Sequence, residues 1–292
     1  MREDLVKLGI GPPESLEKIG LNVKKTYNRF GWQKGERKAW AENMEIPNEA
    51  ETLFFVGCHA SYMYPEIAKS TANILKQGKI DFTILNDERC CGVTQIWDGQ
   101  VQIAKVLANH NVNAIREADA KRVVTACAEC YHTIKFDYPE LIEEKLDFEV
   151  LHISELLSDL VNKGKIKFKE YRKKITYHDP CQLGRGSSVY EPPRNILKSI
   201  QGIELLEMKR HHESSWCCGS GAGQVVRLAS PKLSMKIATD RLLEAKETKV
   251  EALVTTCPFC LNLFASARNI SGIDIEIYDL TTIVMQAIEI CS

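Results

Sequence analysis

The stretch VVTACAEC at residues 123–130 recurs as LVTTCPFC at residues 253–260. In both copies a short apolar run ends in threonine, and a Cys-x-x-Cys pair follows after one further residue. Short apolar runs of this kind are typical of strands that are buried on both faces, as in parallel sheets covered by helices. The two stretches therefore predict two related units, each with cysteines directly beyond a strand.

The repeat extends well beyond these two stretches. Ten of the eleven cysteines follow one pattern twice, namely a single cysteine, then Cys-Cys-Gly, then Cys-x-x-Cys. The first copy comprises Cys58, Cys90, Cys91, Cys127 and Cys130, and the second comprises Cys181, Cys217, Cys218, Cys257 and Cys260. Cys291 has no counterpart in the repeat, and we interpret it as a bystander thiol. A repeat this detailed indicates an internal duplication.

Strand and helix patterns alternate along both copies. We expect strands near residues 52–56, 82–85, 123–125 and 148–151, and again near 174–177, 203–206, 252–255 and 275–278. Such alternation predicts an α/β fold of two pseudo-repeated Rossmann-like halves with parallel sheets. We also expect Asp98 to cap a long helix in the first half.

The expected domains are an N-terminal arm at 1–50, a first cysteine-rich domain at 51–165 and a second at 166–292. The lysine-rich stretch 162–174 is the expected linker between the halves. The arm has two interpretations, a bland surface extension or a partner-docking segment with Trp32 and Trp40 as aromatic anchors.

The cysteines of each copy are expected to meet in space. Most of the cysteine groups follow a predicted strand, and the carboxyl ends of parallel strands share one edge of a sheet, where ligands bind. Two metal sites at the strand carboxyl ends are therefore predicted, one in each half.

Composition indicates which partners and which cellular location to expect for these sites. The chain of 292 residues has 38 basic and 39 acidic residues, so no basic surplus indicates nucleic acid as a partner. No apolar run approaches the roughly 20 residues that span a bilayer, and the first residues lack the apolar core of a signal peptide. We therefore expect a cytoplasmic protein that is not itself membrane-spanning. In that compartment, eleven cysteines favour metal or redox chemistry over disulfides.

The cysteine pattern has three possible chemical interpretations: a zinc site, a redox-active dithiol and iron–sulfur clusters. Zinc usually takes four tetrahedral ligands, which fits five cysteines with two of them adjacent poorly. A redox-active dithiol would explain Cys127 and Cys130 but not the rest of the pattern. Iron–sulfur clusters are held by cysteine thiolates and explain all ten, with the fifth cysteine of each set indicating a cluster of unusual shape.

The duplicated pattern resembles the CCG cysteine-rich domain and, within it, the catalytic subunits of the heterodisulfide reductase family, of the B and D types. The flanking residues Glu88–Gly92 and Tyr177–Arg185 strengthen the resemblance. It implies that the ten repeat cysteines bind two non-cubane 4Fe-4S clusters, five cysteines to each. It also implies that a disulfide such as CoM-S-S-CoB is reduced between the two clusters, which face each other across a cleft.

The resemblance also implies partners. D-type subunits carry an N-terminal ferredoxin-like domain, whereas this chain has no cysteine before Cys58. The expected partner is therefore a separate ferredoxin-like iron–sulfur subunit of the C type, with a flavoprotein or a membrane cytochrome beyond it. Such a complex can lie at the inner face of the membrane.

Several other residues are candidates for roles at the clusters. His59, His132 and His178 lie close to repeat cysteines, and they can donate protons to leaving thiolates or hydrogen-bond to cluster sulfur or backbone. Arg89, Lys135 and Arg185 can bind an anionic substrate or balance the charge of a cluster. These six residues complete the predicted site.

The predicted function is an oxidoreductase subunit that reduces a disulfide or oxidises two thiols. Cleavage of a disulfide takes two electrons, and two clusters can each supply one of them. The alternative is a non-catalytic electron-transfer subunit of a larger redox complex, in which the substrate chemistry takes place elsewhere.

Overall fold

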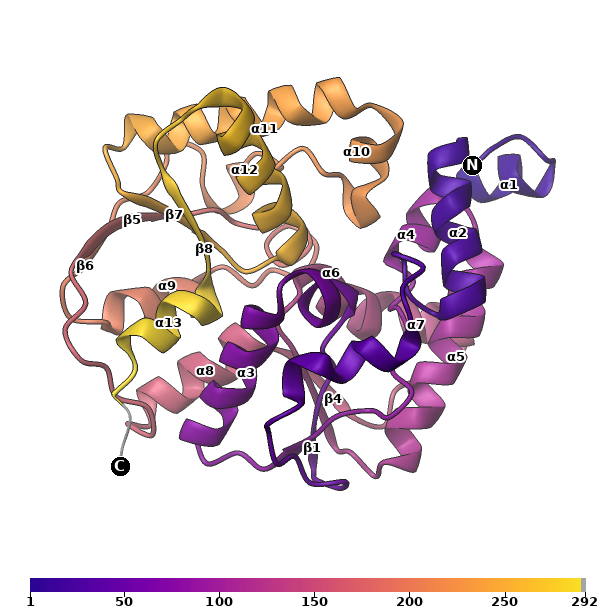
Figure 1. Ribbon diagram of the computed structural model, residues 1–292, viewed down its shortest axis with the longest axis horizontal. Coiled ribbons are helices and arrows are strands. Elements are labelled where there is room, and N and C mark those ends of the chain that lie inside the picture. The colour runs from indigo at the N-terminus through magenta and orange to yellow at the C-terminus, as the bar shows by residue number, and fades with distance from the viewer. Residues whose placement is uncertain (290–292) are drawn as a thin grey trace.

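The computed structural model of the chain describes residues 1–289 (Figure 1), so Cys291 lies outside the described part. Each half contains one four-stranded sheet in which all strands are parallel. The strand orders are β2-β1-β3-β4 and β6-β5-β7-β8, which is the same order twice. The predicted α/β fold of two repeated Rossmann-like halves is confirmed.

The strands are short and lie where the apolar runs predict them. Those of the first sheet are β1 (Thr52–Phe54), β2 (Phe82–Thr83), β3 (Arg122–Thr125) and β4 (Glu149–His152). Those of the second sheet are β5 (Lys173–Tyr177), β6 (Ile203–Leu205), β7 (Ala252–Thr255) and β8 (Glu276–Asp279).

Helices connect the strands and cover the sheets. Those before the second sheet are α1 (Arg2–Lys7), α2 (Glu14–Thr26), η1 (Lys34–Ala41), η2 (His59–Met63), α3 (Pro65–Gln77), α4 (Val93–Asp98), α5 (Val101–Glu117), α6 (Ala128–His132), η3 (Thr133–Asp137), α7 (Tyr138–Ile142) and α8 (Ile153–Asn162). Those of the second half are α9 (Glu191–Ser199), η4 (His212–Ser214), η5 (Ala222–Gln224), α10 (Val225–Ala229), α11 (Pro231–Glu247), α12 (Pro258–Ser271) and α13 (Leu280–Ala287).

One expected helix start is wrong. Asp98 is the last residue of α4 rather than the cap of the long helix, which begins at Val101. Gly99 separates the two helices with a φ of 93°, a left-handed conformation that glycine adopts readily. The Asp98 carboxylate accepts the backbone N–H of Gln100 at 3.0 Å and so stabilises the turn between them.

The two halves share a hydrophobic core. Helices α3 and α8 of the first half pack against α13 and α9 of the second, and Figure 1 shows these four helices between the two sheets. One cluster of buried side chains runs through all four, including Ile67, Leu157, Ile196 and Ile283. The connection at 163–172 falls where the linker is expected, and the division into domains at 165/166 remains a prediction.

The N-terminal arm packs on the rest of its own chain. Helix α2 buries Leu16 and Val23 and contacts α4 of the first half and α10 of the second. Trp40 is 3% exposed, and its ring packs edge-on against Phe54 of β1 at 5.8 Å between centroids. The interpretation of Trp40 as an exposed docking anchor is therefore wrong, because its indole is part of the core. Trp32 is 43% exposed.

Replacing Trp40 by alanine is expected to lower the free energy of unfolding by about 3–5 kcal/mol, the usual cost of removing a large buried aromatic side chain. Trp32→Ala is the matched control, with an expected loss of about 1 kcal/mol from its exposed aromatic contacts. Urea denaturation under reducing conditions measures both. Equal losses from the two variants would contradict the assignment of Trp40 to the core.

No helix among residues 1–289 combines the length and the apolar character needed to cross a bilayer.

Candidate metal centre

Five cysteines meet at the carboxyl edge of the first sheet. Cys58 follows β1, the pair Cys90-Cys91 follows β2, and Cys127 follows β3, while Cys130 lies in the first turn of α6. All five line one small pocket together with Arg29, His59 and Phe259, among other residues. We call this the first thiol pocket.

The second half repeats the arrangement. The second thiol pocket is formed by Cys181 after β5, the Cys217-Cys218 pair in the loop after β6, Cys257 after β7, and Cys260 in α12. Each of the ten cysteines is a free thiol. The structure thus brings together the two predicted sets of five.

The glycine of each Cys-Cys-Gly turn is required by its surroundings. Gly92 and Gly219 have φ values of 85° and 96°, in the left-handed region. A Cβ atom on Gly219 would lie 2.6 Å from the Ser234 carbonyl oxygen, and one on Gly92 would lie 3.4 Å from the Cα atom of Ala104. The two turns therefore lie against α5 and α11 respectively, which positions each cysteine pair at its pocket.

The two pockets differ in exposure. All five cysteines of the first pocket are buried, whereas Cys181 and Cys217 of the second are only half-buried. The arm contributes to this difference, since Arg29 lines the first pocket and Arg37 touches its Cys58. A reactant from solvent therefore reaches the second pocket more readily than the first.

A buried ion pair supports the first pocket. Both terminal nitrogens of Arg37 lie 3.7 Å from the Cys58 sulfur, and Nη2 lies 2.6 Å from Oε1 of Glu88. Glu88 in turn accepts the backbone N–H groups of Val56 and Gly57 at 2.7 and 2.9 Å. Burial opposes the charge of Arg37, but Glu88 and Cys58 hold its pKa well above the ordinary value. The guanidinium therefore places a permanent positive charge beside a predicted ligand sulfur.

The thiols inside each pocket hydrogen-bond with one another, which separates their pKa values. Hydrogen bonds from Cys130 and Cys90 lower the pKa of Cys91 to about 6. In the second pocket, hydrogen bonds from Cys181 and Cys218 lower the pKa of Cys217. Each pocket therefore holds at least one thiol that is readily deprotonated, and the thiolate is the form that binds metals.

Each Cys-x-x-Cys loop contributes one residue to the pocket of the opposite half. Glu129 precedes Cys130 but lines the second pocket, and Phe259 precedes Cys260 but lines the first. The Phe259 ring lies 4.0 Å from that of His59 and 5.0 Å from the Arg29 guanidinium. Burial raises the pKa of Glu129 well above its ordinary value, and its carboxyl accepts the N–H of Gly223 at 2.9 Å.

The two pockets are direct neighbours. Burial opposes ionisation of Cys127, but hydrogen bonds with Cys130 and with Cys257 of the other half hold its pKa at about 5. The thiols of Cys127 and Cys257 thus connect the two sets of five. Any clusters bound in the two pockets would lie next to each other.

The loop at residues 219–224 of the second half packs closely against the first half. A Cβ atom on Gly223 would lie 2.5 Å from the Cα atom of Thr94 in the first half, so only glycine fits there. Arg29 of the arm donates to Gln224 Oε1 at 3.0 Å and to Thr94 Oγ1 at 3.2 Å. The glycine run that follows Cys218 therefore lets the two halves approach closely, and it also lines the second pocket.

The three candidate histidines lie in different surroundings. His59 is buried between Phe259 and Phe30, and burial with the nearby Arg29 lowers its pKa well below the ordinary value. His178 is fully buried, and burial lowers its pKa to about 3. His132 is half-buried, with Nδ1 3.0 Å from Ser187 Oγ across the boundary between the halves, and burial lowers its pKa as well. His59 and His178 are therefore neutral near pH 7.

The three candidate cations are also dispersed. Arg89 stacks on the Tyr27 ring at 3.7 Å and pairs with Asp87, and Lys135 donates to the Tyr131 hydroxyl at 2.7 Å. Arg185 is exposed and donates to the carbonyl of Ser215, two residues before Cys217. Among the described residues that line the two thiol pockets, none of these three cations appears, but Arg185 lies beside the second.

Sequence reasoning missed several residues around the thiols. Arg29, Arg37, Glu129 and Arg241 are buried polar groups that reach the pockets or their neighbours from elsewhere in the chain. The signal for Glu129 was available, because the repeat places Phe259 at the same position and an acidic residue inside a duplicated Cys-x-x-Cys pair is a departure. No local pattern indicated the arginines.

The donor set fits iron–sulfur clusters. Each pocket presents five soft sulfur ligands, which suits iron–sulfur clusters and exceeds the four that zinc needs. The first pocket also has two buried arginines at its wall, which balance thiolate charge.

Comparison with known proteins agrees with this chemistry. The family model for the cysteine-rich domain named CCG matches residues 52–135 and 175–265. The chain is 40% identical to the D-type subunit of the dihydromethanophenazine:CoB--CoM heterodisulfide reductase of Methanosarcina acetivorans, over 99% of this chain and 71% of the relative. It is 35% identical to one subunit, designated B, of the fumarate reductase (CoM/CoB) of Methanothermobacter marburgensis, over 71% of this chain and 40% of the relative.

One further relative and one solved structure are also similar to this chain. An "EtfAB:quinone oxidoreductase" of Syntrophomonas wolfei is 27% identical over 99% of this chain and 43% of the relative. The crystal structure of a hypothetical protein from Helicobacter pylori superposes with a TM-score of 0.60 at 11% identity, covering 95% of this chain and 57% of that one. The second likeness concerns the fold alone.

Proposed function

Since this chain belongs to the CCG cysteine-rich domain family, we propose that it is an oxidoreductase subunit that reduces a disulfide between two non-cubane 4Fe-4S clusters. The coarser statement, an iron–sulfur redox subunit, follows from its relatives, which are heterodisulfide reductase and other iron–sulfur oxidoreductase subunits. The substrate that we propose is a mixed disulfide such as CoM-S-S-CoB, or a related disulfide/thiol pair.

The observation that carries the proposal is the adjacency of two complete sets of five thiols. Cys58, Cys90, Cys91, Cys127 and Cys130 would hold one cluster, and Cys181, Cys217, Cys218, Cys257 and Cys260 the other. When bound, each cluster supplies one electron, so that the pair matches the two electrons a disulfide needs. The contact between Cys127 and Cys257 brings both electron sources to one place, and such proximity is a large part of catalysis.

The chain's own residues would orient and protonate the substrate. The half-buried side of the second pocket, at Cys181 and Cys217, is the proposed entrance for the disulfide. Arg185 beside it is exposed and can bind a carboxylate, sulfonate or phosphate group of the substrate. His132 is the proposed proton donor for a leaving thiolate, because its ring is half-buried while those of His59 and His178 are enclosed.

A partner must supply the electrons. The heterodisulfide reductase and fumarate reductase relatives are each one component of a multi-subunit redox complex. We propose a ferredoxin-like iron–sulfur subunit of the C type as the direct donor, with a flavoprotein or membrane cytochrome behind it. The proposed location is cytoplasmic, in a complex at the inner face of the membrane.

A second candidate function is electron transfer without substrate chemistry. The match to an EtfAB:quinone oxidoreductase over 99% of this chain favours it, because that relative is named for a different reaction. In that case the two adjacent clusters would pass electrons on to a site in another subunit.

Anaerobic reconstitution tests the proposed function. We expect about eight iron atoms and about eight acid-labile sulfides per chain, because each pocket would hold a four-iron cluster. We also expect reduced viologen to drive turnover of at least one disulfide in a panel that includes CoM-S-S-CoB. Stoichiometric zinc without labile sulfide would contradict the cluster assignment. Full iron without disulfide turnover would favour the electron-transfer alternative.

A further inference from the structure

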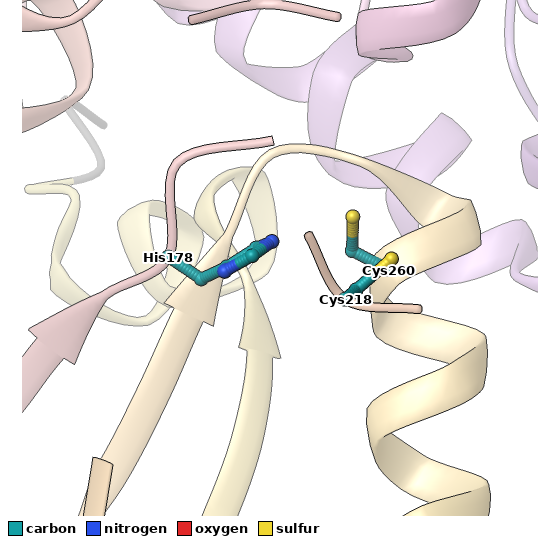
Figure 2. A group of neighbouring side chains, drawn as sticks. All are labelled: His178, Cys218 and Cys260. Carbon is teal, nitrogen blue, oxygen red and sulfur yellow. The ribbon is translucent and has the colours of Figure 1, made fainter. Parts of the chain in front are cut away.

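His178 lies beside two cysteines of the second thiol pocket. It follows β5 directly, is fully buried, and shares a group with Cys218 and Cys260 in which one ring nitrogen and both sulfur atoms lie within 4.8 Å of one another. Figure 2 shows the imidazole directed toward the two thiols, which come from the loop after β6 and from α12. Among the described residues, its Nε2 has no hydrogen-bond partner.

Arg241 determines which nitrogen of this ring carries the proton. The Arg241 Nε–H group donates to His178 Nδ1 at 3.3 Å. A guanidinium group has only donors, so Nδ1 must present a lone pair and the proton of the neutral ring is on Nε2. The ring is thus fixed as a donor at its free nitrogen.

The arginine and the ring are both held in place. Arg241 is fully buried, donates to Glu244 at 2.6 Å, and donates to the Ser215 hydroxyl at 3.1 Å. Phe264 of α12 packs edge-on against the His178 ring at 4.8 Å between centroids. These hydrogen bonds and the packing of Phe264 hold the guanidinium and the ring in this arrangement.

The two halves carry different residues at the positions of His178 and Arg241. The His178 N–H bonds to the Val254 carbonyl, as the Phe55 N–H bonds to that of Val124, so Phe55 is the counterpart of His178 in the first half. Asn111 holds the position in α5 that Arg241 holds in α11, and it donates instead to the Cys90 carbonyl and the Tyr138 hydroxyl. The first half therefore has a phenylalanine, in the same buried cluster as Cys91 and Cys130, at the position where the second half has an N–H donor beside its cysteines.

We propose that His178 sets the reduction potential of the second cluster by donating its Nε2–H hydrogen bond to a sulfur of that cluster. The inference rests on the proposed function, since it needs a cluster in the second pocket. A reduced cluster carries one more negative charge than an oxidised one, and hydrogen bonds to its sulfurs stabilise that charge. His178 acts on the cluster as a positioning and tuning residue, and Arg241 acts through it.

The substitution His178→Phe tests this role by installing the residue of the first half. We expect reconstituted variant and wild type to hold the same iron, while the equilibrium constant for reduction of one cluster falls at least about tenfold, which is 59 mV for one electron. The reduction potential of the other cluster, in the first pocket, should not change. The measurement is a redox titration of the anaerobic protein followed by electron paramagnetic resonance.

The matched control is His110→Phe. His110 lies on α5, and its Nε2 is 2.8 Å from the Asp87 carbonyl, outside both thiol pockets. This variant should leave both titrating components unchanged. Full iron and unchanged components in His178→Phe would overturn the role of His178 while leaving the proposed function intact. A wild-type chain that holds no iron–sulfur cluster would overturn both.

A measurement on the wild type decides the matter if the variant fails to bind its cluster. With ¹⁵N-labelled histidine, electron–nuclear double resonance should show a weak coupling to one histidine nitrogen and a proton that exchanges in D₂O. A strong coupling that persists in Cys91→Ala, which would keep only the second cluster and so excludes His59 of the first pocket, would identify His178 as an iron ligand and overturn the hydrogen bond. The absence of any histidine coupling would also overturn it.

Discussion

Replacing Cys218 by alanine is expected to halve the bound iron, from about eight to about four atoms per chain, and to reduce disulfide turnover to background. The thiol is 3% exposed and is one of the five cysteines that line the second pocket. Because both electrons of the reaction are needed, the remaining cluster cannot complete a turnover alone. Iron analysis and a viologen-linked assay measure the two effects.

Cys91→Ala should produce the same result from the first pocket, and Cys291→Ala serves as the control. Cys291 has no counterpart in the repeat, so its loss is expected to change neither the iron content nor the rate. Full disulfide reduction by Cys218→Ala with half the iron would show that one cluster suffices and would rule out the two-cluster mechanism.

Deleting residues 1–45 is expected to destabilise the protein severely and to empty the first thiol pocket. The deletion removes the buried side chains of Leu16, Val23 and Trp40. It also removes Arg37 and leaves Glu88 buried without its cation, and breaking such a pair typically costs about 3–5 kcal/mol. Together these losses approach the whole stability of a typical domain, about 5–15 kcal/mol.

A shorter deletion provides the matched control. Residues 1–12 include α1, which buries no side chain, so their removal should leave stability and iron content nearly unchanged. Thermal unfolding followed by circular dichroism and iron analysis compare the two deletions. Recovery of about eight iron atoms and normal viologen-driven activity in the 1–45 deletion would contradict a structural role for the arm. It would restore the interpretation of the arm as a docking segment.

A single substitution separates the charge of Arg37 from the packing of the arm. Arg37→Gln keeps the apolar side chains of the arm but removes the cation that lies beside the Cys58 sulfur and pairs with Glu88. If the arm mattered only through its apolar side chains, this variant would keep both clusters at normal potentials.

The sequence by itself determined the features that depend on local pattern. Short apolar runs predicted the strands of both sheets, and the alternation of such runs with helical segments allows few topologies. The repeat of Cys, Cys-Cys-Gly and Cys-x-x-Cys then places ten thiols at two equivalent sheet edges. Periodicity and spacing are properties of neighbouring residues, so no long-range information was needed.

Only the tertiary structure decided how the two halves complete each other. Glu129 and Phe259 occupy the same place in the repeat, yet each lines the pocket of the opposite half. Trp40 has the sequence surroundings of an exposed anchor, among charged residues, but Phe54 of a distant strand buries it. The pairing of Arg241 with His178 likewise joins an interior position of α11 to the end of β5. These contacts depend on which faces of separately folded segments meet, and that choice is made by packing over long sequence distances, which spacing along the chain does not encode.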